Sequence, residues 1–487
     1  MVAALWRGVE PDPPLYYLLI NGWTRLFGVG PLGLRSLSII LFLAALPIMR
    51  QAGEAWFGRR AGRLAMLLSA VHPAHLFFGF AARWYALVFL LTAVLLWLTA
   101  APRPGATALN RNSVRNHTIA WAFAAAALAY ANTFGLVMAG LCWVVGAARD
   151  AGSRRPACHW PAAAAVAVGL YLPWLPAVAR QYQIFQGSGG SWGGWASTAA
   201  RTTLALLTGN LASPEAWWAW GPMAVATVGL ATILLWRGRR EWSMLLIAGG
   251  ALLIGVLTRT MIDKYILTLS GGFCLLAAGL LAGAGKASRV ATPRAIQRVT
   301  VVCLAGGWLG CMANLTMERH WSSLRWLDPL AEVTRRLYDE WRLALRDGGV
   351  APPVITSHPS ARYYFALYEA RSGGAAAPER VAWATAFDNQ NRTADSAPGP
   401  ARTPWAILPW LDGPRPPRAA VTLQTAGFTN LPEWQAVEAR LAQGYELDGE
   451  ERHLHDPYAA WKDRLDPAIR HPVWRLTVRW WRLREAD

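Results

Sequence analysis

Two carboxylates stand beside a stiff turn near the start of the chain. Residues 10–17 read EPDPPLYY, and an apolar stretch follows. Proline fixes its own φ and restricts the residue before it, so the side chains of Glu10 and Asp12 would be held in place. A fixed carboxylate beside a membrane can act as a general base, which makes Asp12 and Glu10 our candidate catalytic residues. Because acid-Pro-Pro is also a common way to begin a helix, a purely structural role stays open.

Three cations are candidates for binding the phosphate of a lipid. Arg83, Arg259 and Lys264 each stand at the predicted outer end of an apolar run, where a lipid head group would lie. Arginine binds phosphate through a bidentate fork and lysine as a point charge. The alternative is that these side chains only reach ordinary head groups from the ends of membrane helices. Arg201 is a weaker candidate of the same kind.

Metal ligands are sparse in this sequence. His72 and His75 flank Pro73 at the end of an apolar run, where they could hold a metal; we expect instead solvated histidines at a kinked helix end. The five cysteines form no CxxC pair and no cluster with histidine, so neither a disulfide framework nor a zinc site is expected. A cofactor cannot be assigned, and a divalent metal has no support in the sequence.

The composition is that of a membrane protein. Hydrophobic residues make up 54% of the 487 residues and charged residues only 16%, whereas soluble domains carry about a quarter charged residues. Several runs are apolar for most of the roughly 20 residues that cross a bilayer. We therefore expect a polytopic α-helical membrane protein of about ten spans. The runs are residues 32–49, 61–78, 84–100, 119–131, 134–148, 160–178, 222–236, 243–258, 265–284 and 299–317.

Basic residues predict the sidedness. Lys and Arg number 47 against 29 Asp and Glu, and 47 − 29 = 18; these cations gather between apolar runs, which favours a polytopic protein over a nucleic-acid binder. Arginine-rich loops stay in the cytoplasm. This rule places residues 1–31 and everything after about 318 outside. No signal peptide precedes residue 32, so we expect that a preceding helix and part of the first external loop are missing, unless residues 15–27 insert as a short or re-entrant helix. The cytoplasmic loops are 50–63, 103–115, 149–155, 237–240 and 286–298.

The predicted external loop 179–221 is rich in glycine and tryptophan. It holds the string GSGGSWGGW and the tryptophans at 217, 218 and 220. Glycine would let the loop move as a lid, and tryptophan could stack on a sugar ring. Tryptophan more often anchors a membrane protein at the interface, and that use stays open here.

From about residue 318 the sequence changes to a water-facing type. We expect a small α/β domain over 318–487 that begins with an amphipathic helix around Leu327–Leu345. Glu450 and Glu451 with the nearby histidines should form a solvated face. The final string WRLTVRWWRLR should be an amphipathic tail in the head-group layer or a helix packed on its own domain. The other expected elements are strands at 352–357, 381–387, 405–411 and 445–447 and helices at 360–373 and 433–443.

Several motifs resemble one enzyme family. The PPLYY string at 13–17 and the elements at Arg35–Ser38, Phe57–Gly62, Arg83–Tyr85, 172–176 (LPWLP) and 263–267 (DKYIL) are similar to motifs of the protein O-mannosyltransferase type. That family consists of polytopic glycosyltransferases of the C fold that use polyprenyl-phosphate sugars. The resemblance covers about residues 13–284 and is strongest at the start. It suggests Tyr16, Tyr85 and Tyr265 as substrate-binding residues.

The resemblance implies an inverting sugar transfer on the external leaflet. A carboxylate would take the proton of an acceptor hydroxyl, and cations would stabilise the departing polyprenyl phosphate. Two departures matter. The catalytic aspartate usual in the family lies before the start of this chain, so the chain is truncated, Asp12 or Glu10 substitutes for it, or the protein is inactive. Lys264 stands where the family usually has arginine.

These features predict a multi-pass glycosyltransferase of the plasma (inner) membrane, with a polyprenyl-phosphate sugar lipid as its partner and an unidentified acceptor. One rival is a transporter or flippase for a lipid-linked sugar, but the apolar runs lack Asp and Glu and show no paired interrupted helices. The other rival is an inactive binding or assembly subunit.

Overall fold

The computed structural model divides the chain into two compact units, Met1–Trp321 and Ser322–Asp487. The division falls four residues after the predicted boundary at 317/318. The residues that the structure describes are 13–28, 30–100, 111–152, 159–185, 195–209, 211, 217–235, 239–257, 266–282, 294–316, 327–346, 354–356, 418–425, 432–455 and 474–484.

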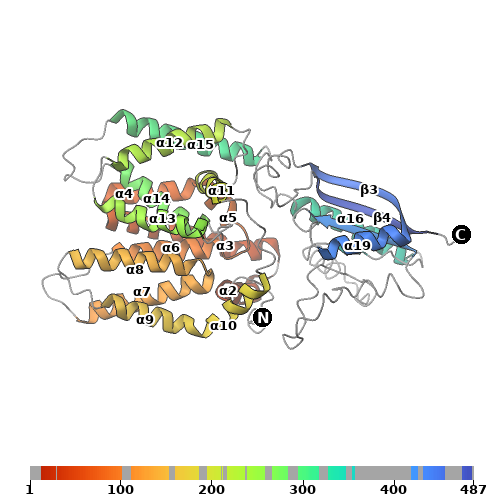
Figure 1. The fold of residues 1–487 in the computed structure, drawn as a ribbon, viewed down its shortest axis with the longest axis horizontal. Helices are drawn as coiled ribbons and strands as arrows, with labels where there is room; N and C mark the ends of the chain where they lie inside the picture. Colours follow the sequence, from red (N-terminus) through yellow and green to blue (C-terminus); the bar gives the residue numbers. More distant parts are fainter. Residues whose placement is uncertain are drawn as a thin grey trace. The chain divides into compact units, whose positions relative to one another are not determined.

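Every regular element described in the first unit is a helix (Figure 1). The first half contains α2 (Leu15–Phe27), α3 (Pro31–Phe57), α4 (Arg59–Val71), α5 (Pro73–Gly79), α6 (Tyr85–Ala100), α7 (Arg111–Ala131) and α8 (Gly135–Gly152). The second half contains α9 (His159–Tyr171), the 3-10 turn η1 (Leu172–Trp174), α10 (Leu175–Phe185), α11 (Trp195–Thr208), α12 (Trp217–Leu235), α13 (Arg239–Leu257), α14 (Ile266–Ala282) and α15 (Arg294–Thr316).

As far as the structure describes them, the predicted apolar runs all lie in these helices. Within the described residues, four helical segments are long and apolar enough to cross a membrane, namely Leu32–Phe57, His159–Arg180, Trp217–Leu235 and Ala295–Ala313. Three shorter apolar helices lie at Tyr85–Ala100, Trp242–Gly255 and Leu267–Ala282. Many large apolar side chains, such as Leu253, Val302 and Leu309, are exposed, as expected of helices that face lipid. The number of spans stays a prediction.

A close hairpin joins α3 to α4. Gly58 takes a φ of 93°, in the left-handed region that favours glycine, and ends α3 by donating its N–H to the carbonyl of Glu54. A Cβ on Gly62 would lie 2.6 Å from the carbonyl oxygen of Arg50, so the two helices touch through their backbones. This contact aligns α3 with α4, and α3 also packs along α6.

Residues 179–221 are not a simple loop, contrary to the prediction. The helix α10 continues to Phe185, α12 already begins at Trp217, and α11 lies between them. α11 packs against α5, α12, α13, α14 and α15, because Ala205 and Leu206 present a buried apolar face. Trp217, Trp218 and Trp220 are exposed in the first turn of α12, and their role as interface anchors stays a prediction. The glycine-rich string 187–194 lies outside the described residues.

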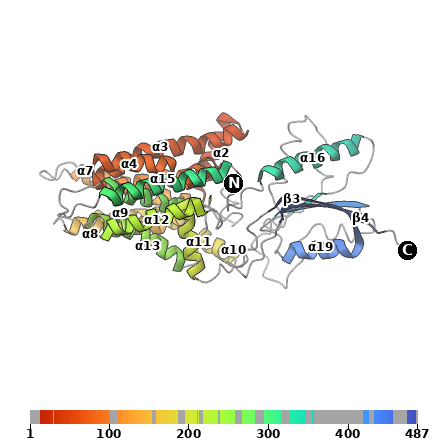
Figure 2. The ribbon, with the colours of Figure 1, turned by 90° about the horizontal axis from the view of Figure 1, so that it is seen from above.

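The second unit is built on a four-stranded mixed sheet in the order β1-β2-β4-β3. β1 and β2 are parallel, and β4 is antiparallel to both β2 and β3. Helices α16 and α19 lie on opposite sides of this sheet (Figure 2). The elements are α16 (Leu327–Arg346), β1 (Val354–Thr356), β2 (Ala419–Thr425), α19 (Pro432–Gly444), β3 (Tyr445–His455) and β4 (Trp474–Leu483).

The amphipathic C-terminal tail was a wrong prediction. Residues 474–483 form β4, an interior strand between β2 and β3. Its side chains alternate between the two faces, and Leu476 and Val478 are fully buried. The indole N–H of Trp481 donates to the Thr422 hydroxyl at 2.9 Å and so ties β4 to β2. Tryptophan and arginine mimic an interfacial helix in composition, but here they follow the two-residue period of a strand.

Some of the other predictions for the second unit are confirmed, and others lie outside the described residues. The amphipathic helix, the strand at 352–357 and the helix at 433–443 are confirmed as α16, β1 and α19. The strand at 445–447 extends to His455, and β2 was not predicted. The expected elements at 360–373, 381–387 and 405–411 lie outside the described residues.

The expected solvated face on β3 is partly exposed and carries an ion-pair network. The Glu450 carboxylate forms ion pairs with Arg452 and with Nε of Arg479, the latter at 2.6 Å. Arg479 also forms an ion pair with Glu438 of α19. Glu451 pairs with Arg336 of α16. Neighbouring residues of a strand point to opposite faces, so this one pair of glutamates joins the sheet to both of its helices.

Candidate functional site

The predicted motifs lie at the two ends of α3. Tyr16 follows the two prolines in the first turn of α2, and Arg35–Ser38 lie in the first turns of α3. The Phe57–Gly62 turn lies at the other end of this 27-residue helix, roughly 30 Å from Arg35–Ser38 at about 1.5 Å per residue. We call the end of the helical unit that holds Tyr16, Ser38, Arg83 and Tyr171 the motif end. α2, α5, α10 and α11 all lie toward this end (Figure 1).

Tyr16 contacts Ser38 at the motif end, where Arg83 also lies. Both Tyr16 and Ser38 are buried, and their hydroxyl oxygens are 3.2 Å apart, in hydrogen-bond contact. Arg83 stands in the turn between α5 and α6, where it is exposed, and its charge acts on the Tyr16 hydroxyl. An exposed guanidinium beside an anchored phenol could bind a phosphate oxygen while the phenol holds its own position.

The next residue of the motif, Tyr17, joins α2 to a second predicted motif. Its ring lies edge-on to that of Tyr16, with centroids 6.3 Å apart. Tyr17 packs against a buried cluster of Ala129, Tyr171, Trp174 and Ala177, of which Trp174 belongs to the LPWLP string. Sequence segments some 150 residues apart are therefore packed side by side at the motif end.

Tyr85 is placed differently from Tyr16. It is buried, and its ring packs edge-on against Phe78 at 5.0 Å and Trp84 at 4.6 Å. Tyr85 begins α6 two residues after Arg83, so this packing fixes the turn that presents Arg83. Its role in binding substrate stays a prediction.

His72 and His75 are buried, which corrects the expectation of solvated histidines. Nδ1 of His72 accepts the N–H of Ala74 at 3.2 Å and caps α5. Nδ1 of His75 donates to the Ser69 carbonyl at 2.7 Å, and its Nε2 lies 2.6 Å from the Ser270 hydroxyl. The cause is Pro73, which has no N–H for the carbonyl four residues earlier. His75 supplies the missing donor and at the same time ties α5 to α14.

In the described part of the chain, no group of three or more His, Cys, Asp or Glu side chains is arranged to hold a metal ion. His75 already uses both ring nitrogens in hydrogen bonds to α4 and α14. His75 thus ties this helix break to α14, and His72 caps α5 through Nδ1.

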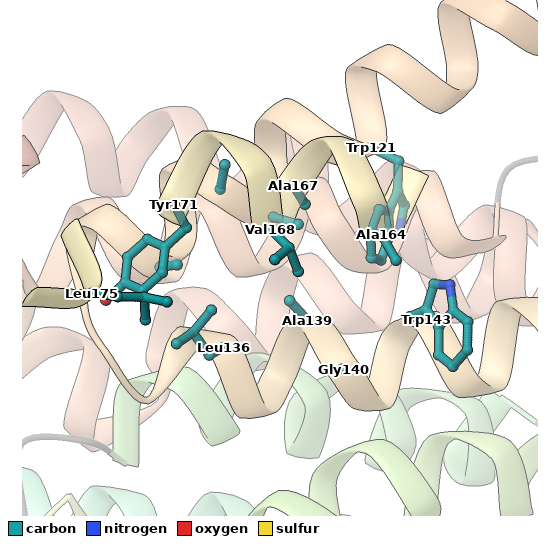
Figure 3. Close-up of a pocket in the computed structure, with 13 residues that line it drawn as sticks. Trp121, Leu136, Ala139, Gly140, Trp143, Ala164, Ala167, Val168, Tyr171 and Leu175 are labelled. Carbon is teal, nitrogen blue, oxygen red and sulfur yellow. The ribbon is translucent and has the colours of Figure 1, made fainter. Parts of the chain in front are cut away.

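An apolar groove of about 380 Å³ runs between α7, α8 and α9 and ends at the motif end (Figure 3). Tyr171 and Leu175 lie at one end of it, and Trp121 and Trp143 at the other. This groove was not predicted, since the sequence of these segments indicates only apolar runs. Alanines at helical spacing on α7 and α9 were the available signal. The lining residues are Trp121, Ala125, Ala126, Ala129, Leu136, Ala139, Gly140, Trp143, Ala164, Ala167, Val168, Tyr171 and Leu175.

Five of the predicted site residues lie outside the described residues. They are the two candidate catalytic carboxylates and three residues before α14: Glu10, Asp12, Arg259, Lys264 and Tyr265. Arg201 lies on α11, but its side chain is not among those described. The roles of all six stay predictions.

No protein-family model and no curated protein matches the chain. Two solved structures do. Both are of ArnT from Cupriavidus metallidurans, one in the apo state and one bound to undecaprenyl phosphate. Each has a TM-score of 0.54 at 14% sequence identity, and each alignment covers 96% of this chain and 87% of the other. The chain thus has the fold of ArnT, along nearly the whole length of both proteins.

Proposed function

We propose that this protein is a membrane glycosyltransferase that takes a sugar from a polyprenyl-phosphate donor. The observation that carries the proposal is the ArnT fold, which has been solved with undecaprenyl phosphate bound. Tyr16, Ser38 and Arg83 support it, because they place a fixed phenol and an exposed cation at the motif end. The motifs of the protein O-mannosyltransferase type add the sugar-transfer chemistry, although their finer resemblance is part of the proposal.

The proposed reaction is a direct displacement at the anomeric carbon. Asp12 or Glu10 accepts the proton of the acceptor hydroxyl, and the hydroxyl oxygen bonds to the anomeric carbon from the face opposite the phosphate. The bond between that carbon and the phosphate oxygen breaks, and the polyprenyl phosphate leaves with the electron pair. Arg83, Arg259 and Lys264 stabilise the negative charge that develops on the leaving phosphate.

We place this reaction on the external face of the plasma membrane. The motif end would then face outward, as the loops with few cations do under the positive-inside rule. Arg83 would lie at the depth of the lipid head groups, where the phosphate of a polyprenyl carrier also lies. The second unit would stand outside the cell.

The proposal is tested by donor turnover. Purified full-length protein in nanodiscs is given a radiolabelled polyprenyl-phosphate sugar and an envelope extract as the source of acceptor, and sugar release is measured. Loss of one cation that contacts the transition state should lower kcat by roughly 10²-fold in Arg83→Ala, Arg259→Ala and Lys264→Ala. Arg180→Ala is the control, since Arg180 is another exposed arginine near this end, on α10.

Two outcomes would count against the proposal. Equal turnover in all four variants and the wild type would remove the phosphate-site assignment. No release by the wild type with any polyprenyl-phosphate sugar would favour the inactive binding subunit instead.

A further inference from the structure

We propose that the groove between α7, α8 and α9 holds the first part of the donor's polyprenyl chain, with the phosphate-bearing end of that chain at Tyr171. The inference rests on the proposed function for the identity of the lipid. It adds the path of the hydrocarbon chain, the residues that line it, and a position that controls its entry.

The lining selects a hydrocarbon. The indole N–H groups at the far end of the groove are already used: Trp121 donates to the Thr99 hydroxyl at 3.2 Å, and Trp143 to the Trp160 carbonyl at 2.8 Å. Apart from Tyr171, the other lining side chains are those of Ala, Gly, Val and Leu, which offer no hydrogen bond. A sugar or a peptide would lose its hydrogen bonds to water here without replacement, whereas a hydrocarbon loses nothing.

The groove has the shape of a channel for a chain. Small residues keep the three helices from filling the space between them: Ala125, Ala126 and Ala129 on α7, Ala139 and Gly140 on α8, and Ala164 and Ala167 on α9. The lining runs from Ala164 to Leu175, which is about 16 Å at 1.5 Å per residue. This length is roughly half of the 30 Å hydrocarbon core of a bilayer.

One end of the groove meets the candidate site. Tyr171 lines the groove and also belongs to the packed cluster that includes Trp174 and receives Tyr17. The ring of Tyr17 in turn packs edge-on against that of Tyr16. The positive charge of Arg83 acts on the Tyr16 hydroxyl. A chain that enters at Tyr171 therefore has its head at the motif end. This continuity brings the head of a chain in the groove to the cations proposed for the donor phosphate, so the carrier lipid is the occupant we propose.

Gly140 offers a clean test of this path. It is exposed on α8, and a Cβ built on it meets no atom within 4 Å, so Gly140→Leu should extend into the groove without disturbing the helix packing. Gly169 on α9 is the matched control. It is also exposed, and its added Cβ also meets no atom within 4 Å, but it does not line the groove.

The experiment is photo-crosslinking of the full chain in nanodiscs. The probe is a polyprenyl phosphate with a diazirine in its second isoprene unit, and adducts are mapped by mass spectrometry. Wild type and Gly169→Leu should be labelled on α7, α8 and α9. Gly140→Leu should bind about tenfold more weakly, since displacing roughly two buried CH₂ groups is worth about one factor of ten.

Competition identifies the source of the chain. Unlabelled polyprenyl phosphate should abolish the adducts, and an excess of phosphatidylglycerol should not. Equal labelling of Gly140→Leu and Gly169→Leu, adducts outside these helices, or equal competition by the phospholipid would each overturn the inference.

This inference and the proposed function can fail separately. Labelling in the groove without sugar release would support the proposed lipid path and contradict the proposed enzyme activity. Sugar release with unchanged labelling in Gly140→Leu would support the proposed enzyme activity and contradict the proposed lipid path.

Discussion

At the scale of single residues, the site joins a fixed phenol to an exposed cation. Burial and the contact with Ser38 hold the Tyr16 hydroxyl in place, while Arg83 remains open to solvent at the start of α6. Arginine suits this position because its planar fork can bind two phosphate oxygens at once. In the proposed site, Tyr16 would hold its position and Arg83 would supply the charge.

Glu450 gives the second unit a stability that depends on pH. Burial acts to raise the pKa of Glu450, but the hydrogen bonds and charges of Arg479 and Arg452 outweigh burial, so the pKa lies below its ordinary value of 4.5. A lowered pKa in the folded state stabilises the fold above the ordinary value, and this stabilisation is lost as the pH falls below it.

Replacing Glu450 should therefore destabilise β3 at neutral pH only. We expect Glu450→Gln to lower the free energy of local opening by about 1–2 kcal/mol at pH 7, since Glu450 is partly exposed, and to match the wild type at low pH. Hydrogen exchange of the β3 amides in the full chain measures this. Glu446→Gln, an exposed carboxylate on the same strand, is the control; a loss that persists unchanged at low pH would contradict the account.

At the scale of elements, α11 depends on one glycine for its contact with α5. Gly209 follows the last residue of α11 with a φ of +63°, and a Cβ there would lie 2.3 Å from the backbone nitrogen of Ala74. Gly209→Ala therefore carries both backbone strain and a backbone clash. We expect it to destabilise the helical unit by about 2 kcal/mol or more, seen as a lower Tm of the full chain in detergent.

Gly306→Ala on α15 is the matched control for that substitution. Its added Cβ meets no atom within 4 Å and its φ is ordinary, so its Tm should equal or exceed that of the wild type. A Gly209→Ala protein as stable as Gly306→Ala would show that α11 does not rest on α5 as described.

Helices were predictable because lipid-facing and core-facing sides are both apolar, so each apolar run indicates helix, although the runs 61–78 and 160–178 are each divided between two α-helices. Pro73 likewise marked the break between α4 and α5. Burial of His75 was not predicted, since it depends on the Ser69 carbonyl that Pro73 leaves without a donor. β4 was missed because its Trp and Arg composition outweighed its two-residue period in our interpretation.

The candidate site was predictable only as separate motifs. The PPLYY and LPWLP strings each suggested a role, but their contact through Tyr17 depends on how α2 packs on α7 and α10, which no local pattern states. The groove, too, depends on how helices pack against one another. Its alanines lie on three helices, and only packing makes them one surface.

At the scale of the whole molecule, the proposed external reaction predicts which parts of the chain face the outside of the cell. We expect a membrane-impermeant maleimide to label Glu446→Cys in the second unit on intact cells, and to leave Arg59→Cys at the α3–α4 turn unlabelled until the cells are permeabilised. Both positions are exposed, so access to the reagent decides the result. Labelling of Arg59→Cys alone on intact cells would show that the membrane topology is the reverse of the predicted one. It would contradict the proposal that the reaction takes place on the external face.

The central claim is that cations at the motif end bind the phosphate of a polyprenyl carrier, and comparison of two ligands measures it directly. Binding of polyprenyl phosphate and of polyprenol of the same length to the full chain differs only in the phosphate. We predict that wild type binds the phosphate at least about tenfold more tightly, the effect of one charge-assisted hydrogen bond, and that Arg83→Ala narrows this difference. Equal affinity of the wild type for the phosphate and the alcohol would contradict the account.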